Sequence, residues 1–229
     1  MPRPEKGWIG DMIRQWFFEL RMTSYWNMNG ELESRQIFTA PVNFQTESGE
    51  HVEFNITPNR EVLPGNFEVS EGVVIPEGDY RFVNYKFEIS SASFRKIQFD
   101  FEYGFGPFYN GHYTDTETEL TLKINGYASL QAGANLVRGD LPQGKFSENV
   151  YFSKINLYLT PDLGINNYIQ FDDISNQVGY NGRFFWQIRP GNIIYLVYNS
   201  NIKRHFDPES RFRLTEDQVL FKIQMSIRF

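Results

Sequence analysis

Three histidines, His51, His112 and His205, are the side chains in this sequence best able to transfer protons near neutral pH. Two of them have carboxylates close by in the sequence, which is the combination used in general acid–base catalysis. The candidate sets are His112 with Asp115 and Glu117, and His205 with Asp207 and Glu209. Both sets fall in predicted loops or strand ends, where solvated polar residues are common. We therefore expect no catalytic residue, and an enzyme with an active site at its rim stays an alternative.

Metal and cofactor sites have no signature in the sequence. The histidines lack ligand spacing, and the absence of cysteine excludes thiolate ligands, disulfides and a Cys nucleophile. Asp172 and Asp173 are adjacent, and adjacent residues of a strand point to opposite faces, so we reject them as a paired catalytic site. Gly104–Gly106 and Gly139–Gly144 lack the helix of a phosphate-binding loop and are interpreted as turn glycines. We expect no metal and no cofactor.

The composition indicates a strand-rich chain with two different faces. The 229 residues suit one domain, 1–229, and 22 Lys+Arg against 28 Asp+Glu exclude the basic surface of a nucleic-acid binder. Aromatic residues make up 17%. The mean hydropathy is −0.46, and no stretch approaches the roughly 18 apolar residues of a membrane-spanning helix. A membrane-spanning barrel strand needs only about 9–11 residues, with every second one apolar.

Strict alternation of apolar and polar residues recurs along the chain. Within 96–105, for example, Phe99, Phe101 and Tyr103 alternate with Gln98, Asp100 and Glu102. This period of two is typical of strands with one polar and one apolar face. Alternation between turn signals predicts about twelve strands, at 12–27, 31–45, 51–58, 80–90, 95–106, 112–125, 127–137, 149–159, 165–173, 177–189, 193–200 and 218–229. Most connections are short, and we expect long ones at 59–79, 138–148 and 201–217.

Twelve strands make too wide a cylinder for one layer of side chains to fill, which favours a polar interior and an apolar exterior. We therefore predict an all-β, transmembrane, antiparallel up-and-down β-barrel, either complete or part of a larger one. A soluble β-sandwich that acts as a binding module is the alternative, since its inner faces can hold the same aromatic residues.

The two faces of such a barrel have different expected roles. We expect the inward charges to cross-link the wall through ion pairs, and the selection of permeants is the alternative role. These charged residues are Lys86, Glu88, Lys96, Asp100, Glu102, Glu119, Lys123, Lys154, Arg183, Lys222 and Arg228. We expect aromatic residues near strand ends to form girdles at the two membrane surfaces; they are Trp8, Trp26, Tyr103, Tyr109, Tyr127 and Tyr198.

The C-terminal segment carries the most specific pattern. Its apolar residues occupy every second position up to the last residue, and the intervening positions are nearly all polar. The series resembles the C-terminal strand by which bacterial outer-membrane proteins are recognised for assembly. We therefore assign an assembly signal to Val219, Phe221, Ile223, Met225, Ile227 and Phe229.

Three further motifs resemble one group of Gram-negative outer-membrane proteins. They are Gly72–Phe82, Arg138–Phe146 and Arg189–Asn199. They are similar to the C-terminal β-barrel region, a domain of unknown function, of proteins that carry an N-terminal domain similar to family 9 carbohydrate-binding modules. The resemblance covers about 16–229, nearly the whole chain.

The resemblance implies a location in the bacterial outer membrane and a role in the passage or docking of a solute, with an oligosaccharide as the candidate ligand. The expected partners are the lipid bilayer and the outer-membrane assembly machinery. The signal peptide and the carbohydrate-binding domain of the group are missing here, so we expect Met1 to lie inside a longer protein or at the start of a truncated gene. No catalytic residues can be transferred from the group.

Overall fold

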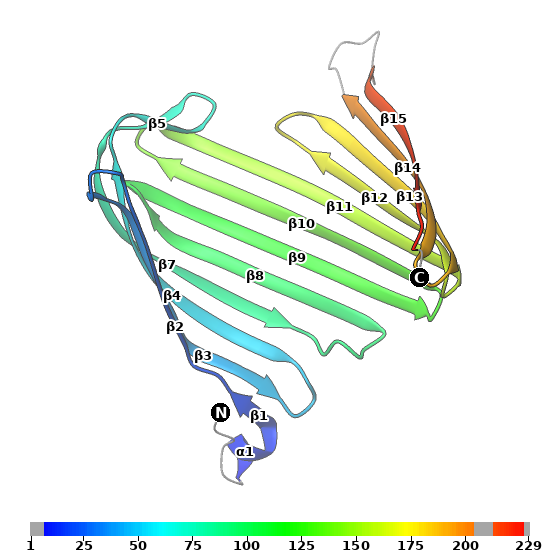
Figure 1. Ribbon diagram of the computed structural model, residues 1–229. Helices are drawn as coiled ribbons and strands as arrows, with labels where there is room; N and C mark the ends of the chain where they lie inside the picture. Colours follow the sequence, from blue (N-terminus) through cyan, green and yellow to red (C-terminus); the bar gives the residue numbers. More distant parts are fainter. Residues whose placement is uncertain (1–6, 204–212, 227–229) are drawn as a thin grey trace. The chain divides into compact units, whose positions relative to one another are not determined.

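The structure, a computed structural model, describes residues 7–203 and 213–226 (Figure 1). Most of them are in strands. The elements are α1 (Trp8–Met12), β1 (Ile13–Trp16), β2 (Glu19–Trp26), β3 (Leu32–Thr46), β4 (His51–Leu63), β5 (Phe67–Ser70), β6 (Val73–Ile75), β7 (Gly78–Ser90), β8 (Ile97–Phe108), β9 (Gly111–Asn125), β10 (Ala128–Leu141), β11 (Gly144–Thr160), β12 (Leu163–Asp172), β13 (Gln177–Arg189), β14 (Asn192–Lys203) and β15 (Arg213–Gln224).

The chain divides into two compact units, which are described separately below. Unit 1 contains residues 1–94, 98–118 and 136–147, and unit 2 contains residues 95–97, 119–135 and 148–229. Within the described ranges, no helix has the length and apolar character needed to cross a membrane.

Thirteen strands pair into one antiparallel meander, which confirms the all-β prediction. Their order is β1-β3-β4-β7-β8-β9-β10-β11-β12-β13-β14-β15, and β2 also pairs with β3. Each of the twelve predicted strand ranges overlaps observed strands. The first range is divided into β1 and β2 opposite a register shift of β3, which lies between Thr39 and Val42. Pro41 stands at that shift and has no N–H to donate to a neighbouring strand.

The predicted closure of the sheet is not present in the described residues. A closed barrel requires the first and last strands to pair, whereas here β1 and β15 are the two ends of the strand order. Alternation determines which face of a strand is apolar, but it contains no information about which strands meet at the edges.

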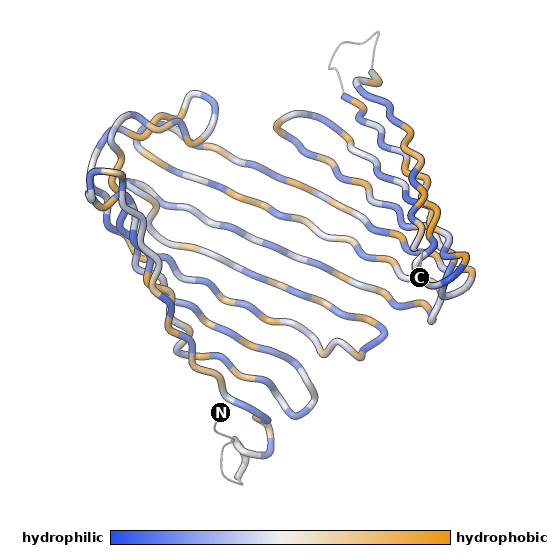
Figure 2. The backbone as a smooth tube through the Cα atoms, viewed as in Figure 1, coloured by the Kyte–Doolittle hydropathy of each residue, from blue (hydrophilic) through white to orange (hydrophobic). Residues whose placement is uncertain are grey.

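Hydrophobic and hydrophilic residues alternate along the strands (Figure 2), and the strand register sorts them onto two different faces. In unit 2, Phe184 of β13 is directly opposite Ile165 of β12 and Leu196 of β14, and Leu196 is opposite Phe221 of β15. The next residue of β13, Arg183, is opposite Asn166 on the other face. The pairs of unit 1 are sorted in the same way, with Phe54 opposite Phe87 and Asn55 opposite Lys86.

Few hydrophobic side chains are buried in the described part of the chain. They are Ile13, Ala40, Val73, Ile75, Phe82, Ala92 and Leu141. Many more are exposed on the apolar face, among them Leu157, Phe221 and Val219, whose exposed fractions are 47%, 64% and 65%.

A hydrophobic cluster of unit 1 is formed in part by the hairpin of β5 and β6. Val73 and Ile75 pack with Leu141 at the end of β10, and Tyr109 and Phe146 border them. The hairpin accounts for part of the long connection predicted at 59–79. The long connection predicted at 138–148 is wrong, because β10 continues to Leu141 and β11 begins at Gly144.

Gly104 and Gly139 lie within strands, which corrects their interpretation as turn glycines. Gly139 has a packing role: a Cβ atom there would lie 2.1 Å from the ring of Phe146. This aromatic ring takes the space that a side chain on the neighbouring strand would need.

Candidate functional site

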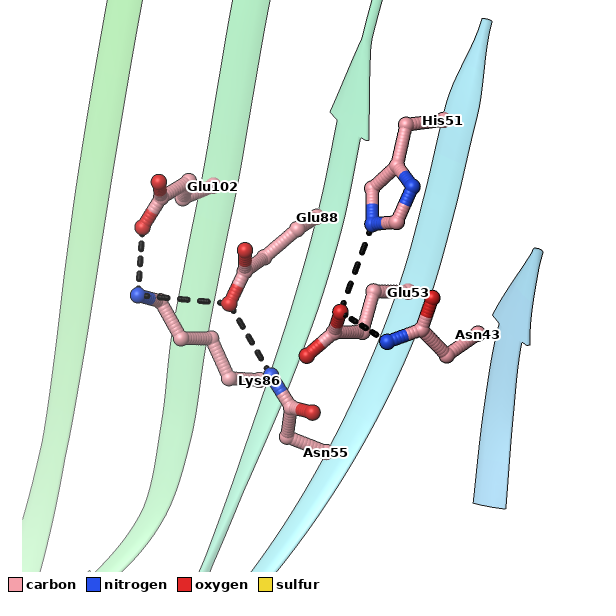
Figure 3. A network of polar contacts seen from close by, with 7 residues as sticks. All are labelled: Asn43, His51, Glu53, Asn55, Lys86, Glu88 and Glu102. Atoms are coloured by element: carbon pink, nitrogen blue, oxygen red, sulfur yellow. Dashed lines mark hydrogen bonds and ion pairs between the residues drawn. The ribbon is translucent and has the colours of Figure 1, made fainter. Parts of the chain in front are cut away.

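The polar face of unit 1 carries a network of amide and charged side chains (Figure 3). Asn43 of β3 donates a hydrogen bond from Nδ2 to Oε2 of Glu53 on β4, at 2.5 Å. The Nε2 atom of His51 lies 3.3 Å from the same carboxylate oxygen. His51 therefore has a carboxylate partner on its own strand, β4.

Three carboxylates lie side by side in this network. Glu53 is directly opposite Glu88 of β7, and Glu88 is directly opposite Glu102 of β8. Lys86 compensates two of them: its Nζ atom lies 3.4 Å from Oε1 of Glu88 and forms an ion pair with Oε2 of Glu102. Asn55 donates from Nδ2 to Oε1 of Glu88 at 2.9 Å.

The network connects neighbouring strands. Of the predicted charged residues, Lys86 and Glu102 form an ion pair between β7 and β8, whereas the pair of Lys86 with Glu88 lies within β7. Lys154, which belongs to the same predicted set, instead lies over the rings of Phe152 and Tyr168, 5.1 Å and 5.9 Å from their centroids. The predicted Arg228 lies outside the described residues.

The polar face of unit 2 carries a groove of about 420 Å³ along β12–β15. Side-chain amides dominate its lining. Asn181 of β13 donates a hydrogen bond to Asn199 of β14, whose Nδ2 lies 3.5 Å from Oε1 of Gln218 on β15. Asn201 donates to Oε2 of Glu216 at 3.0 Å. The lining comprises Tyr168, Gln170, Asp172, Ser175, Gln177, Gly179, Tyr180, Asn181, Asn199, Asn201, Glu216 and Gln218.

We call Asn181, Asn199, Asn201 and Gln218 the amide ladder. It offers closely spaced hydrogen-bond donors and acceptors on a surface open to water. An amide presents both a carbonyl acceptor and an N–H₂ donor, which matches the hydroxyl groups of an uncharged polar solute. Tyr168, whose hydroxyl donates to Oε1 of Gln170 at 2.7 Å, adds an aromatic ring to the groove. The arrangement fits reversible binding and contains no nucleophile activated by a base.

Of the two predicted catalytic sets, the one around His112 is not assembled in the described residues. His112, Asp115 and Glu117 all lie in β9. The two acids are an odd number of residues from His112, so the pleat directs them to the opposite face. His205, Asp207 and Glu209 lie outside the described residues. In the described ranges, no group of three or more His, Asp or Glu side chains is arranged to hold a metal ion.

Asp172 and Asp173 have separate partners, in agreement with their rejection as a catalytic pair. The Oδ1 atom of Asp172 accepts hydrogen bonds from the backbone N–H groups of Ile174 and Ser175, at 2.9 Å and 3.2 Å. The carboxylate of Asp173 accepts hydrogen bonds from the backbone and side chain of Asn149. Both carboxylates stabilise the β12–β13 turn.

The aromatic residues predicted near strand ends occupy different kinds of position. Trp26 and Tyr127 lie at strand ends or turns and are more than half exposed. Tyr103 lies inside β8, stacked on Phe105. Tyr109 packs against the hydrophobic cluster formed in part by the β5–β6 hairpin, where burial, together with Glu61 and Tyr80, raises the pKa of its phenol. The side chain of Trp8 lies outside the described residues.

The predicted assembly strand corresponds to β15 and the residues after it. Val219, Phe221, Ile223 and Met225 are all more than half exposed. Phe221 and Ile223 lie on the same face, opposite Leu196 and Ile194 of β14. Ile227 and Phe229 lie outside the described residues.

Comparisons with protein families, curated proteins and solved structures found no match to this chain. The amide ladder was missed by sequence reasoning, because its members come from three strands and only their register brings them together.

Proposed function

We propose that this chain forms the wall of a β-barrel in a bacterial outer membrane, with its apolar face on lipid and its polar face on a hydrated interior. The observation that carries the proposal is the exposed apolar face. The chain exposes 15521 Å², whereas a water-soluble monomer of 26.9 kDa exposes roughly 10,800 Å² by the usual scaling with mass. Contact of the apolar face with lipid would remove its exposed hydrophobic side chains from water.

Strand length supports the same proposal. The strands from β7 to β15 contain 10–17 residues, and about 9–11 tilted residues cross the hydrocarbon layer. A soluble sandwich needs a second sheet to cover the apolar face. The described residues supply, besides the large sheet, only the two-stranded β5–β6 hairpin.

A bilayer also requires partners for the two edges of the sheet, because unpaired backbone groups are costly in hydrocarbon. We propose that the edge formed by β1 and β2 and the edge formed by β15 pair with each other or with further strands of the same wall. The chain has no cysteine, so engineered cysteine pairs along Thr23–Tyr25 and Val219–Phe221 would report direct pairing by disulfide formation.

The interior role that we propose is docking or passage of an uncharged polar solute, with an oligosaccharide as the candidate. The amide ladder of unit 2 supports it, since hydroxyl-rich molecules bind through such donor and acceptor sets. The resemblance of Gly72–Phe82, Arg138–Phe146 and Arg189–Asn199 to barrels that follow a carbohydrate-binding domain is consistent with this class of solute. The separation of His112 from Asp115 and Glu117 makes a rim enzyme the weaker candidate.

The first test is partition. The purified chain should require detergent to remain soluble and should show β-rich circular dichroism in micelles. A monodisperse, detergent-free monomer with a sharp thermal transition would refute the membrane proposal.

The second test addresses the solute. The folded chain should bind neutral oligosaccharides in equilibrium dialysis, and Asn199→Leu should weaken that binding by removing the central amide of the ladder. Gln36→Leu removes an amide of unit 1, which donates to Asn59, and serves as the matched control. Equal binding by both variants would exclude the amide ladder as the docking site.

A further inference from the structure

Three arginines lie side by side on the apolar face of unit 1. Arg35 of β3 is directly opposite Arg60 of β4, and Arg60 is directly opposite Arg81 of β7. Neighbouring strands are about 4.8 Å apart, so the three Cα atoms lie within about 10 Å. Like charges directly opposite each other destabilise an antiparallel pair. The electrostatic repulsion within this arginine row therefore destabilises the sheet, and the packing of the strands gives no reason for its presence.

Acidic side chains compensate the arginine row only in part. Asp79 accepts two hydrogen bonds from Arg60, at 3.0 Å and 2.8 Å, and lies 3.7 Å from Nη2 of Arg81. Arg35 donates from Nε to the hydroxyl of Ser24 at 3.2 Å. Glu33, two residues before Arg35, is the next acid along β3. Three guanidinium groups against these two carboxylates leave a net positive charge.

The arginine row borders an apolar groove. The groove has a volume of about 380 Å³ and is lined by the three arginines and by Ile37, Pro58, Asn59, Phe82 and Val83. Pro58 and Val83 are directly opposite each other. Each lies two residues from the arginine of its own strand, on the same face and toward the middle of the strand. The groove therefore combines a cationic end with an apolar floor. This arrangement is complementary to a molecule that has an anionic group attached to an apolar chain.

We propose that the arginine row binds the phosphate of an anionic lipid headgroup, with the lipid chain along the apolar floor. This inference rests on the proposed membrane location. Arginine binds phosphate through paired, charge-assisted hydrogen bonds, and a bound phosphate relieves the repulsion within the row. Trp26 ends β2 beside this region and is 55% exposed, as expected of an indole at the headgroup level.

The experiment measures quenching of tryptophan fluorescence by brominated lipids. The full chain is refolded into phosphatidylcholine vesicles that contain either brominated phosphatidic acid or brominated phosphatidylcholine. Wild type should prefer the anionic lipid, and Arg35→Gln and Arg81→Gln should each reduce that preference about fivefold. Arg183→Gln removes an arginine from the polar face of unit 2 and should leave the preference unchanged.

The outcomes separate the two proposals. Failure to insert into either vesicle would overturn the membrane proposal, whereas insertion without an anionic preference would overturn only the lipid site. An unchanged preference in both Arg35→Gln and Arg81→Gln would likewise overturn it. Inorganic phosphate, compared with chloride at matched ionic strength, should not displace the lipid. Loss of the preference on adding phosphate would assign the row to the free ion and contradict the lipid as ligand.

Discussion

Two adjacent residues of β15 allow the orientation of the wall to be tested with one kind of substitution. Phe221 and Leu220 are both large and hydrophobic, with exposed fractions of 64% and 47%. Phe221 lies on the apolar face opposite Leu196, and Leu220 lies on the polar face opposite Val197. Replacing each by arginine therefore places the same charge at the same depth on opposite faces.

The expected magnitudes follow from the position of Phe221 in the strand. Phe221 lies three residues before Gln224, where β15 ends, which is about 10 Å along the strand. An arginine on the lipid face costs about 2–4 kcal/mol at the midplane and about 0–1 kcal/mol near an interface. For Phe221→Arg we expect about 2 kcal/mol, or about thirtyfold in the folding equilibrium. Leu220→Arg lies on the polar face, near Val197, Arg183 and Lys222, and should cost about 1 kcal/mol or less.

The assay is urea unfolding of the refolded chain in phosphatidylcholine vesicles, followed by circular dichroism and by electrophoretic mobility without heating. Refolding from urea bypasses cellular assembly, so the part of Phe221 in the assembly signal does not enter the comparison. Equal losses of stability in Leu220→Arg and Phe221→Arg would refute the assignment of the two faces.

Three further measurements test individual contacts. Lys86→Met should lower the free energy of unfolding by about 1–2 kcal/mol, because Glu88 and Glu102 then face each other without a cation, and Glu102→Gln in the same chain should restore part of it. Burial raises the pKa of Tyr109, so the folded state holds the phenol proton more tightly than the unfolded state does. The resulting contribution to stability is fully present below the ordinary phenol pKa of about 10 and is lost as the pH rises above that value. Tyr109→Phe should therefore show a smaller loss of stability at alkaline pH. Deleting Phe229 should reduce outer-membrane assembly in cells far more than refolding in vitro, and unchanged cellular assembly would contradict the assembly signal.

The positions of the strands could be predicted because alternation is a local property. Each residue of a half-buried strand reports its own face, so the range predicted at 177–189 corresponds to β13 without any knowledge of its neighbours. Strand ends were harder to predict where turn-forming residues lie inside strands. Gly139 is one such case, because the ring of Phe146 fills the space beside it.

The candidate sites could not be predicted because they depend on register. Arg35, Arg60 and Arg81 are far apart in the sequence, and only the pairing of β3, β4 and β7 places them in one row. The amide ladder has the same origin in β13, β14 and β15. The histidines could be selected as candidates from the sequence alone. The rows of polar side chains in the structure could not, because each row contains residues from several strands.

Pairing at the edges decides how the two faces can function. If β15 and the strand formed by β1 and β2 join, about twelve strands enclose an interior too wide for side chains alone to fill. Water then solvates the carboxylates around Lys86 and keeps the amides around Asn199 accessible to a solute. If further strands lie between the two edges, the interior is wider, and the amide ladder becomes one part of a longer polar wall. In both cases the arginine row stays on the apolar face, because its register is determined within β3, β4 and β7. The lipid site therefore does not depend on the final number of strands, whereas solute passage does.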